Sequence, residues 1–330
     1  MIDIGSALQW VNWEYPSVIS DSLRYWIGRI MDPILPPDER LATMSDLIKV
    51  AGGISNPLEQ AEILIYCGGQ GYVLGDMDNA ANWLIKAADL YEYCQDHHRH
   101  ATALWMLFIV QRSRGKYRQA FDMARRARKL FIDQADDRLQ KKETATESWY
   151  RGRILDMTCE LISSPEDMFE CLFEFQGSNL SSSAAEIKNR IAIQVEKKDY
   201  QKTGAEMELL LGITIRSLCP QETAEALAFC GVVSWVLEDK KGAINFFRSA
   251  MSQYIPKSFE YAVLQWMLGL GLFTVPAEVY SAVNQMETSI QNFDQLRMKA
   301  IHENHLERRD WFATHHSAMK RVLRTMVEAT

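Results

Sequence analysis

The sequence has no excess of basic charge and no cysteine pattern. With a formal net charge of -7, the chain is not expected to bind nucleic acid generally, because neutralising phosphates requires a basic face. Its 6 cysteines are scattered without a C-x-x-C pair, in a chain too large to need disulfide stapling. These features favour a protein with reduced thiols in a cytoplasm.

The sequence also has no targeting segment and no long uninterrupted apolar run. Its first residues lack the basic start and apolar core of a signal peptide. The most apolar stretch, 261–277, is interrupted by Gln265 and closed by Pro276, so we expect a buried helix there and not a membrane span. The sequence therefore predicts a soluble, cytoplasmic protein without a membrane partner.

What the chain does contain is an apolar fraction of 47% and small residues at helical spacing. Between positions 237 and 250, Ala243, Phe247 and Ala250 fall on one face of a predicted helix, and Gly231 precedes Ala243 on the helix before. The same offsets recur three times elsewhere, most weakly in the last set: Gly68, Ala80, Leu84 and Ala87; Phe108, Ala120, Ala124 and Ala127; Ile191, Thr203, Met207 and Leu210. Such repetition indicates a helical repeat in which small residues let paired helices approach closely.

This frame resembles the tetratricopeptide repeat (TPR). Its period of about 40 residues is longer than that of a strict TPR and is similar to the extended bacterial units of maltose-regulator-like activators and signalling ATPases. The resemblance implies an all-α fold, a right-handed superhelix (α-solenoid) of helix-turn-helix repeats with helical caps. It also implies packing roles for Gly68, Ala80, Ala87, Ala120, Ala127, Gly231, Ala243, Phe247 and Ala250.

The same reading divides the chain into three parts. We expect an N-terminal helical cap with an aromatic leader at 1–55, repeats at 56–286 and charged capping helices at 287–330. A degenerate repeat is expected around 141–176, where the Gly and Ala marks are missing. Prolines and periodicity predict helices at about 20–31, 37–51, 276–286, 288–305 and 308–326.

No motif in the sequence predicts catalysis or a metal site. His302 and His305 are separated by one residue fewer than the zinc motif H-E-x-x-H requires. The Gly-Gly-Gln-Gly run beginning at Gly68 lacks the lysine of a phosphate-binding loop and no strand precedes it. We therefore expect a non-enzyme without cofactor or metal.

The TPR resemblance implies that the first helix of each repeat lines a concave groove. Offsets from the repeat alanines place six candidate partner-binding residues there: Tyr72, Trp105, Ile109, Arg112, Lys188 and Trp235. Aromatic and arginine side chains most often dominate binding energy. Packing between repeats is an equal alternative for Trp105 and Trp235 taken singly.

The function expected from these residues is a protein-interaction scaffold or regulator that captures another protein or a peptide segment in the groove. A first alternative is a sensor or inhibitor subunit of a bacterial signalling or defence ATPase or protease, cleaved near Ser181 in a Ser-rich loop. A second alternative is a nucleic-acid-associated component that uses the basic block around Arg125. The usual explanation of that block is a solvated helix face, on which Arg125, Arg128 and Lys129 are expected to be exposed. The oligomeric state and the partner stay open.

Overall fold

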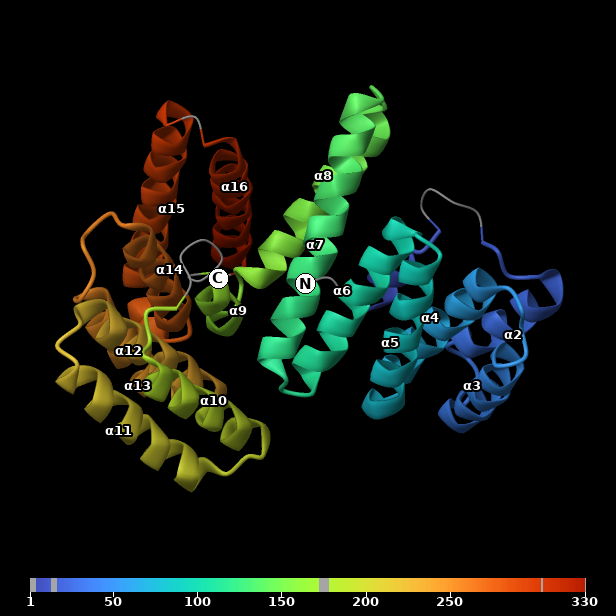
Figure 1. Cartoon of the computed structure of the whole chain (residues 1–330), viewed down its shortest axis with the longest axis horizontal. Coiled ribbons are helices and arrows are strands. Elements are labelled where there is room, and N and C mark those ends of the chain that lie inside the picture. The colour runs from blue at the N-terminus through green and yellow to red at the C-terminus, as the bar shows by residue number, and fades with distance from the viewer. Residues whose placement is uncertain (1–3, 13–16, 172–177, 304, 330) are drawn as a thin grey trace. The chain divides into compact units, whose positions relative to one another are not determined.

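The structure is a computed structural model that describes residues 4–12, 17–171, 178–303 and 305–329. Over these residues every regular element is a helix, so the predicted all-α class is confirmed (Figure 1). By their contacts the helices group into two compact units, Met1–Met157 and Thr158–Thr330, and the division falls within α8. Each unit has its own core and is described separately below.

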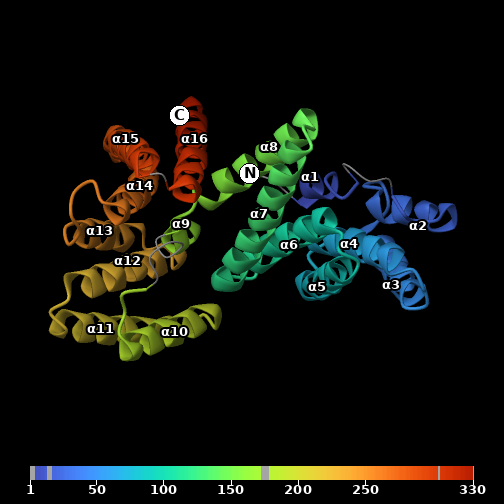
Figure 2. The same ribbon diagram turned by 45° about the horizontal axis from the view of Figure 1, so that its top comes forward.

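Eight helices begin in the first unit: α1 (Ile4–Leu8), α2 (Asp21–Met31), α3 (Pro37–Ala51), α4 (Pro57–Val73), α5 (Met77–Tyr93), α6 (His97–Ser113), α7 (Tyr117–Gln140) and α8 (Thr144–Leu161). The second unit contains α9 (Pro165–Cys171), α10 (Ser182–Glu196), α11 (Tyr200–Arg216), α12 (Pro220–Val236), α13 (Lys240–Met251), α14 (Phe259–Phe273), the short 3-10 helix η1 (Pro276–Glu278), α15 (Val279–His302) and α16 (Leu306–Glu328). In Figure 2 the helices α11 to α15 of the second unit follow one another, each against the next.

The two units repeat one architecture, a longer repeat than the period of about 40 residues predicted from the sequence. In both, a short helix is followed by a connection and then by a run of consecutive α-helices, α2 to α8 from the first unit and α10 to α16 in the second. The best-matched stretch runs from α4 to α5 and from α12 to α13. Identical residues occupy the same positions in these stretches: Pro57 and Pro220, Glu59 and Glu222, Glu62 and Glu225, Cys67 and Cys230, Gly68 and Gly231, Asp76 and Asp239, Ala80 and Ala243, Ala87 and Ala250.

Consecutive helices pack in pairs because small residues stand where the two backbones approach. A Cβ added to Gly68 in α4 would lie 2.6 Å from the Leu84 side chain of α5, and one added to Gly231 would lie 2.5 Å from Phe247 of α13. Both glycines are buried, and Ala80 and Ala243 opposite them are fully buried. All nine residues expected to pack the repeats are inside the units.

Short turns join the helices of each pair through a backbone of recurring shape. The second residue after the helix adopts a positive φ, at Gly75, Gln95, Gly115, Lys198 and Glu238. In three of these turns the next residue is an aspartate whose side chain caps the following helix: Asp96 accepts from the Arg99 amide, Asp199 from Lys202 and Asp239 from Gly242. The sequence thus stops and restarts each helix within very few residues.

A cluster of aromatic rings closes each unit at corresponding positions. In the first unit Phe131 of α7 packs against Trp149 and Tyr150 of α8. In the second unit Phe293 of α15 packs in the same way against Trp311 and Phe312 of α16, with ring centroids 6.1 and 6.0 Å apart. Aromatic pairs at such separations contribute beyond their buried area, so the last helices of each unit are well anchored.

Two details of the expected organisation are wrong. The helices predicted at 276–286 and 288–305 are one continuous helix, α15, preceded by η1. The boundary placed between repeats and C-terminal cap at 286/287 therefore lies inside a helix. The division into 1–55, 56–286 and 287–330 stays a prediction. By contacts, residues 1–55 belong to the first unit and residues 287–330 to the second. The helices predicted at 20–31 and 37–51 are confirmed.

Candidate functional site

Three of the six predicted partner-binding residues lie at adjacent helix ends in the first unit. The Tyr72 hydroxyl at the end of α4 lies 3.2 Å from Ser113 Oγ at the end of α6. Ile109 and Arg112 belong to this same last turn of α6, and the Arg112 guanidinium lies 5.7 Å from the Phe108 ring. Tyr72, Ile109 and Arg112 are all half-buried, and we call these three residues the helix-end cluster.

Trp105 is not available to a partner in this structure, contrary to the groove assignment. Its side chain is completely buried, and its ring centroid lies 4.6 Å from that of Phe108. A tryptophan buried in this way stabilises the fold and has no surface left for recognition. The alternative of packing, left open from the sequence, is the role that its burial supports.

Lys188 is also engaged within its own unit. Its Nζ lies 3.8 Å from the buried carboxylate of Glu225 and within 4.9 and 5.4 Å of the Phe169 and Phe229 ring centroids. Both the carboxylate and the ring faces favour a cation at this position. Lys188 therefore balances an internal charge instead of standing free as a groove cation.

Trp235 is half-buried and occupies the place in the second unit that Tyr72 occupies in the first. It ends α12 as Tyr72 ends α4, and a Cβ on Gly271 of α14 would lie 3.9 Å from its ring. Lys240 covers it, with Nζ 3.5 Å from the ring centroid and a hydrogen bond from Nζ to the Trp235 carbonyl. The ring is thus fixed by a cation–π contact while part of it stays exposed.

The face of α4 and α6 that was expected to line a groove is covered by α1. A Cβ on Gly69 would lie 2.8 Å from Leu8 of α1 and 3.0 Å from Met106 of α6, and Ile65 of α4 is fully buried. In the second unit α9 contacts α12 and α14 in the corresponding way. Each unit therefore fills part of this face with its own leading helix.

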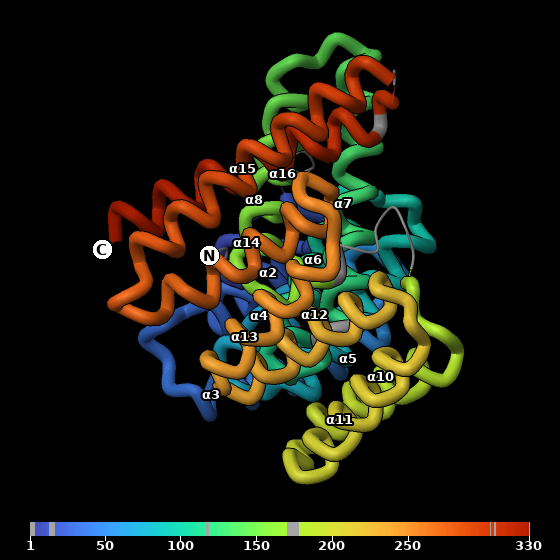
Figure 3. Tube along the Cα trace, turned by 90° about the vertical axis from the view of Figure 1, so that its left-hand side faces the viewer, coloured from blue at the N-terminus to red at the C-terminus, as the bar shows by residue number. Residues whose placement is uncertain are grey.

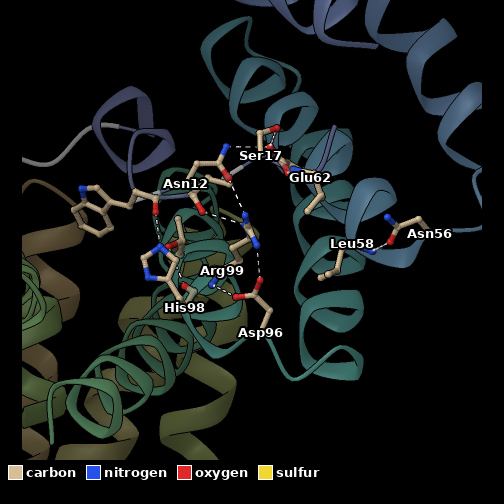
Figure 4. Close-up of polar contacts among 12 residues, drawn as sticks. Asn12, Ser17, Asn56, Leu58, Glu62, Asp96, His98 and Arg99 are labelled. Atoms are coloured by element: carbon tan, nitrogen blue, oxygen red, sulfur yellow. Dashed lines mark hydrogen bonds and ion pairs between the residues drawn. The ribbon is translucent and has the colours of Figure 1, made fainter. Parts of the chain in front are cut away.

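A buried carboxylate that the sequence reading missed holds the segment after α1 in place (Figure 4). Glu62 of α4 is fully buried and accepts hydrogen bonds from Asn12 Nδ2 at 3.0 Å, from the Ser17 hydroxyl and from the Val18 amide at 2.8 Å. One turn earlier on α4, Glu59 accepts from the Ser20 amide at 2.8 Å. A buried charge requires such a set of donors, so these contacts fix where the leading segment joins α2.

Two side chains of α6 bind the same segment from the other side. Arg99 donates to the Val11 carbonyl at 3.1 Å and to Asn12 Oδ1 at 3.0 Å, and pairs with Asp96 at 2.7 Å (Figure 4). His98 Nε2 donates to the Trp10 carbonyl, since a carbonyl can only accept. Its Nδ1 lies 3.3 Å from the Tyr150 hydroxyl, within hydrogen-bond distance, so both ring nitrogens have a polar partner inside the unit.

The Tyr66 hydroxyl completes this network without ionising. Burial and the neighbouring Glu62 carboxylate raise the pKa of Tyr66. Its hydroxyl accepts from Asn12 Nδ2 at 3.3 Å. Every group named here is occupied in holding the chain together, so the network is an anchor and offers no unpaired base or nucleophile.

The second unit repeats the anchor with the same residue types. Glu225 accepts from Ser178 Oγ and from the Asn179 amide, both at 2.6 Å, and Glu222 accepts from the Ser181 amide at 2.8 Å. The signal for both anchors is present in the sequence as two spacings that occur twice: Ser17-x-x-Ser20 before Pro57-x-Glu59-x-x-Glu62, and Ser178-x-x-Ser181 before Pro220-x-Glu222-x-x-Glu225. Comparing the two halves of the chain would have revealed it.

The remaining sequence candidates are placed as follows. Ser181 is exposed at the start of α10, but its amide is held by Glu222. In the basic block, Arg125, Arg126 and Lys129 are exposed whereas Arg128 is buried, which corrects the expectation that Arg128 belongs to the exposed face. Trp13 and Tyr15 of the aromatic leader lie outside the described residues, while Trp10 packs on Phe131 and Trp149.

Neither the comparison with models of known protein families nor the comparison with curated proteins finds a match for this chain. In the described part of the chain, none of the helices combines the length and apolar character needed to cross a membrane.

Proposed function

We propose that this chain is a non-catalytic protein-interaction scaffold or regulator of the TPR type, whose helix pairs form a right-handed superhelix. The close helix contacts at Gly68 and Gly231 and the recurring short turns support the TPR assignment, because this family pairs its helices through small residues. In this proposal the chain captures a segment of another protein.

The observation that carries the proposal is the helix-end cluster. Tyr72, Ile109 and Arg112 come from two successive first helices, α4 and α6, and are half-exposed together. Tyrosine and arginine are among the side chains that most often dominate the binding energy of a protein interface. Trp235 gives the second unit an aromatic at the corresponding place. Trp105 and Lys188 have no part in capture, because both serve the interior of their own unit.

Affinity purification from cells of the source organism tests this proposal, with Tyr72→Ala/Arg112→Ala as the test variant. We expect the wild type to retain a discrete partner that this variant loses while its helical circular dichroism is unchanged. Tyr93→Ala is the matched control, because Tyr93 is an exposed tyrosine at the end of α5, a second helix of its pair. Partner retention by the test variant, or equal loss by the control, would refute the assignment of the cluster.

A further inference from the structure

One side of α11 is buried in the second unit, and the opposite side carries exposed apolar residues together with the exposed charged residues Glu208 and Arg216. Thr203, Leu210 and Thr214 are fully buried, and the helical period places Ala205, Leu209, Gly212 and Ile215 on the other side. Leu209 is 46% exposed and Ile215 60% exposed. We call Ala205, Leu209, Gly212 and Ile215 the α11 strip; α11 lies at the outer edge of its unit in Figure 3.

The corresponding helix of the first unit shows that the fold does not need this strip. In the first unit the positions of Leu209 and Gly212 are occupied by Asp46 and Lys49 of α3, and that of Ile215 by Gly52, which directly follows α3. Asp46 and Lys49 form a solvated ion pair at 3.0 Å, as expected of an outer helix face. The buried side is kept, with Leu47 at the position of Leu210. The second unit therefore carries an apolar surface that its architecture does not require, and such surfaces mark interaction sites.

We propose that a second copy of this chain covers the α11 strip, with the two α11 helices packed antiparallel across a two-fold axis. Centring the crossing on Gly212 of both copies determines the register. Leu209 of each copy then lies opposite Ile215 of the other, and Glu208 lies opposite Arg216 of the other. The surface is thus complementary to itself in shape and in charge, which an interface between identical copies requires.

Charge is the first argument for this occupant. Glu208 and Arg216 are exposed on either side of Gly212, and over the part of the chain that the structure describes neither side chain has an ion-pair partner. They are separated by eight positions, more than two helical turns, so they cannot pair with each other within one helix. In an antiparallel dimer, Glu208 of each copy pairs with Arg216 of the other, which gives two ion pairs. A parallel arrangement would instead place like charges opposite each other.

The second argument is the glycine at the centre. A Cβ built on Gly212 meets no atom within 4 Å, so nothing inside the unit requires glycine there. Glycine in a helix interior destabilises it relative to alanine. A close approach by a second helix explains the residue, because the missing side chain lets Leu209 and Ile215 of the two copies meet around it. A strip one helix long is small for an interface, so we expect a dimer of micromolar affinity.

Sedimentation equilibrium of the full chain over about 1 to 100 μM tests the dimer. Glu208→Arg and Arg216→Glu each place like charges opposite each other twice, so each should raise the dissociation constant by about tenfold or more. The double variant Glu208→Arg/Arg216→Glu should return to the wild-type value. An equimolar mixture of the two single variants should form a heterodimer at wild-type affinity, because every pair is again of opposite sign.

Leu209→Asp and Ile85→Asp form the matched control pair, since both replace an exposed aliphatic residue on a helix surface. Only Leu209→Asp should abolish the dimer, and thermal melting should show both variants folded. A wild type that stays monomeric over the whole range overturns the proposal. So does a dimer that Leu209→Asp leaves intact, or one that the mixed single variants do not restore, since each means that another surface is used.

Discussion

Glu62 and Glu225 perform the same task at the same position of two repeated units. Each is a buried carboxylate of the unit's fourth helix, and each accepts a serine hydroxyl and the amide of the next residue from the segment that leads into the second helix. The pair shows that the two units share the polar anchor as well as the helices. It also shows which residues hold the leading segments in position.

Replacing either carboxylate should destabilise its unit. Glu62→Ala leaves Asn12, Ser17 and Val18 without their acceptor, and we expect a loss of about 3 kcal/mol in the free energy of unfolding. Chemical denaturation measures the loss, with Glu39→Ala, at an exposed carboxylate of α3, as control. Hydrogen exchange should also quicken at Val18 in the variant. A loss no larger than that of the control would show that the anchor is unimportant.

Two glycines inside helices should respond oppositely to replacement by alanine. Gly68→Ala drives a Cβ against Leu84, so we expect destabilisation by about 2 kcal/mol. Gly152→Ala in α8 meets no atom within 4 Å and should stabilise by about 0.5–1 kcal/mol through helix propensity. Thermal melting distinguishes the two signs. Equal effects at both positions would contradict the close helix approach.

Acid should weaken the second anchor through Glu222. Burial raises the pKa of Glu222, but hydrogen bonds from Ser217 and Ser181 more than offset this and leave the pKa below the ordinary value of 4.5. A carboxylate with a lowered pKa contributes stability that is present above about pH 4.5 and is lost as the pH falls through the folded-state pKa. Melting temperatures between about pH 3 and 7 should fall more steeply for the wild type than for Glu222→Gln. If the melting temperatures of the two proteins change in parallel with pH, Glu222 does not contribute to the loss of stability in acid.

Trp105 and Trp235 should differ sharply in their effect on stability. Trp105 is fully buried, so Trp105→Ala should cost about 3–5 kcal/mol in the free energy of unfolding. Trp235 is half-buried, and Trp235→Ala should cost less than half as much. Urea denaturation of the two variants gives the comparison. A mild Trp105→Ala variant would restore that residue as a candidate for partner binding.

The thiols should react in an order set by burial. Burial raises the pKa of both Cys67 and Cys230 to about 12, so almost no thiolate is present near neutrality. Cys94 and Cys219 are half-exposed, so iodoacetamide at about pH 8 should alkylate them before Cys67 and Cys230. Peptide mapping with and without denaturant measures the order. Early labelling of Cys67 in the native protein would contradict the packing of α4.

Much of the fold could be predicted from the sequence because it depends on local chemistry. Proline begins α4 and α12, Asp239 caps α13, and small residues at helical spacing determine where α4 touches α5 and α12 touches α13. The prediction of two separate helices in the region of α15 was wrong, because charged residues continue a helix as readily as they follow its end. The two anchors could have been predicted from spacings that occur twice in the sequence, but these spacings are noticed only when the two halves of the chain are compared.

Three outcomes depended on tertiary structure alone. Helical spacing gave Trp105 and Tyr72 the same status, yet only packing buries the first and leaves the second half-exposed. Spacing likewise offered Lys188 to a partner, while the fold brings Glu225 and two rings to it from distant positions. The apolar strip of α11 became visible once Thr203, Leu210 and Thr214 showed which side faces inward. The amino-acid order by itself determined the helices and their pairing, because those contacts are made between near neighbours. Burial and charge balance are set by residues far apart in the chain, and only the folded structure brings them together.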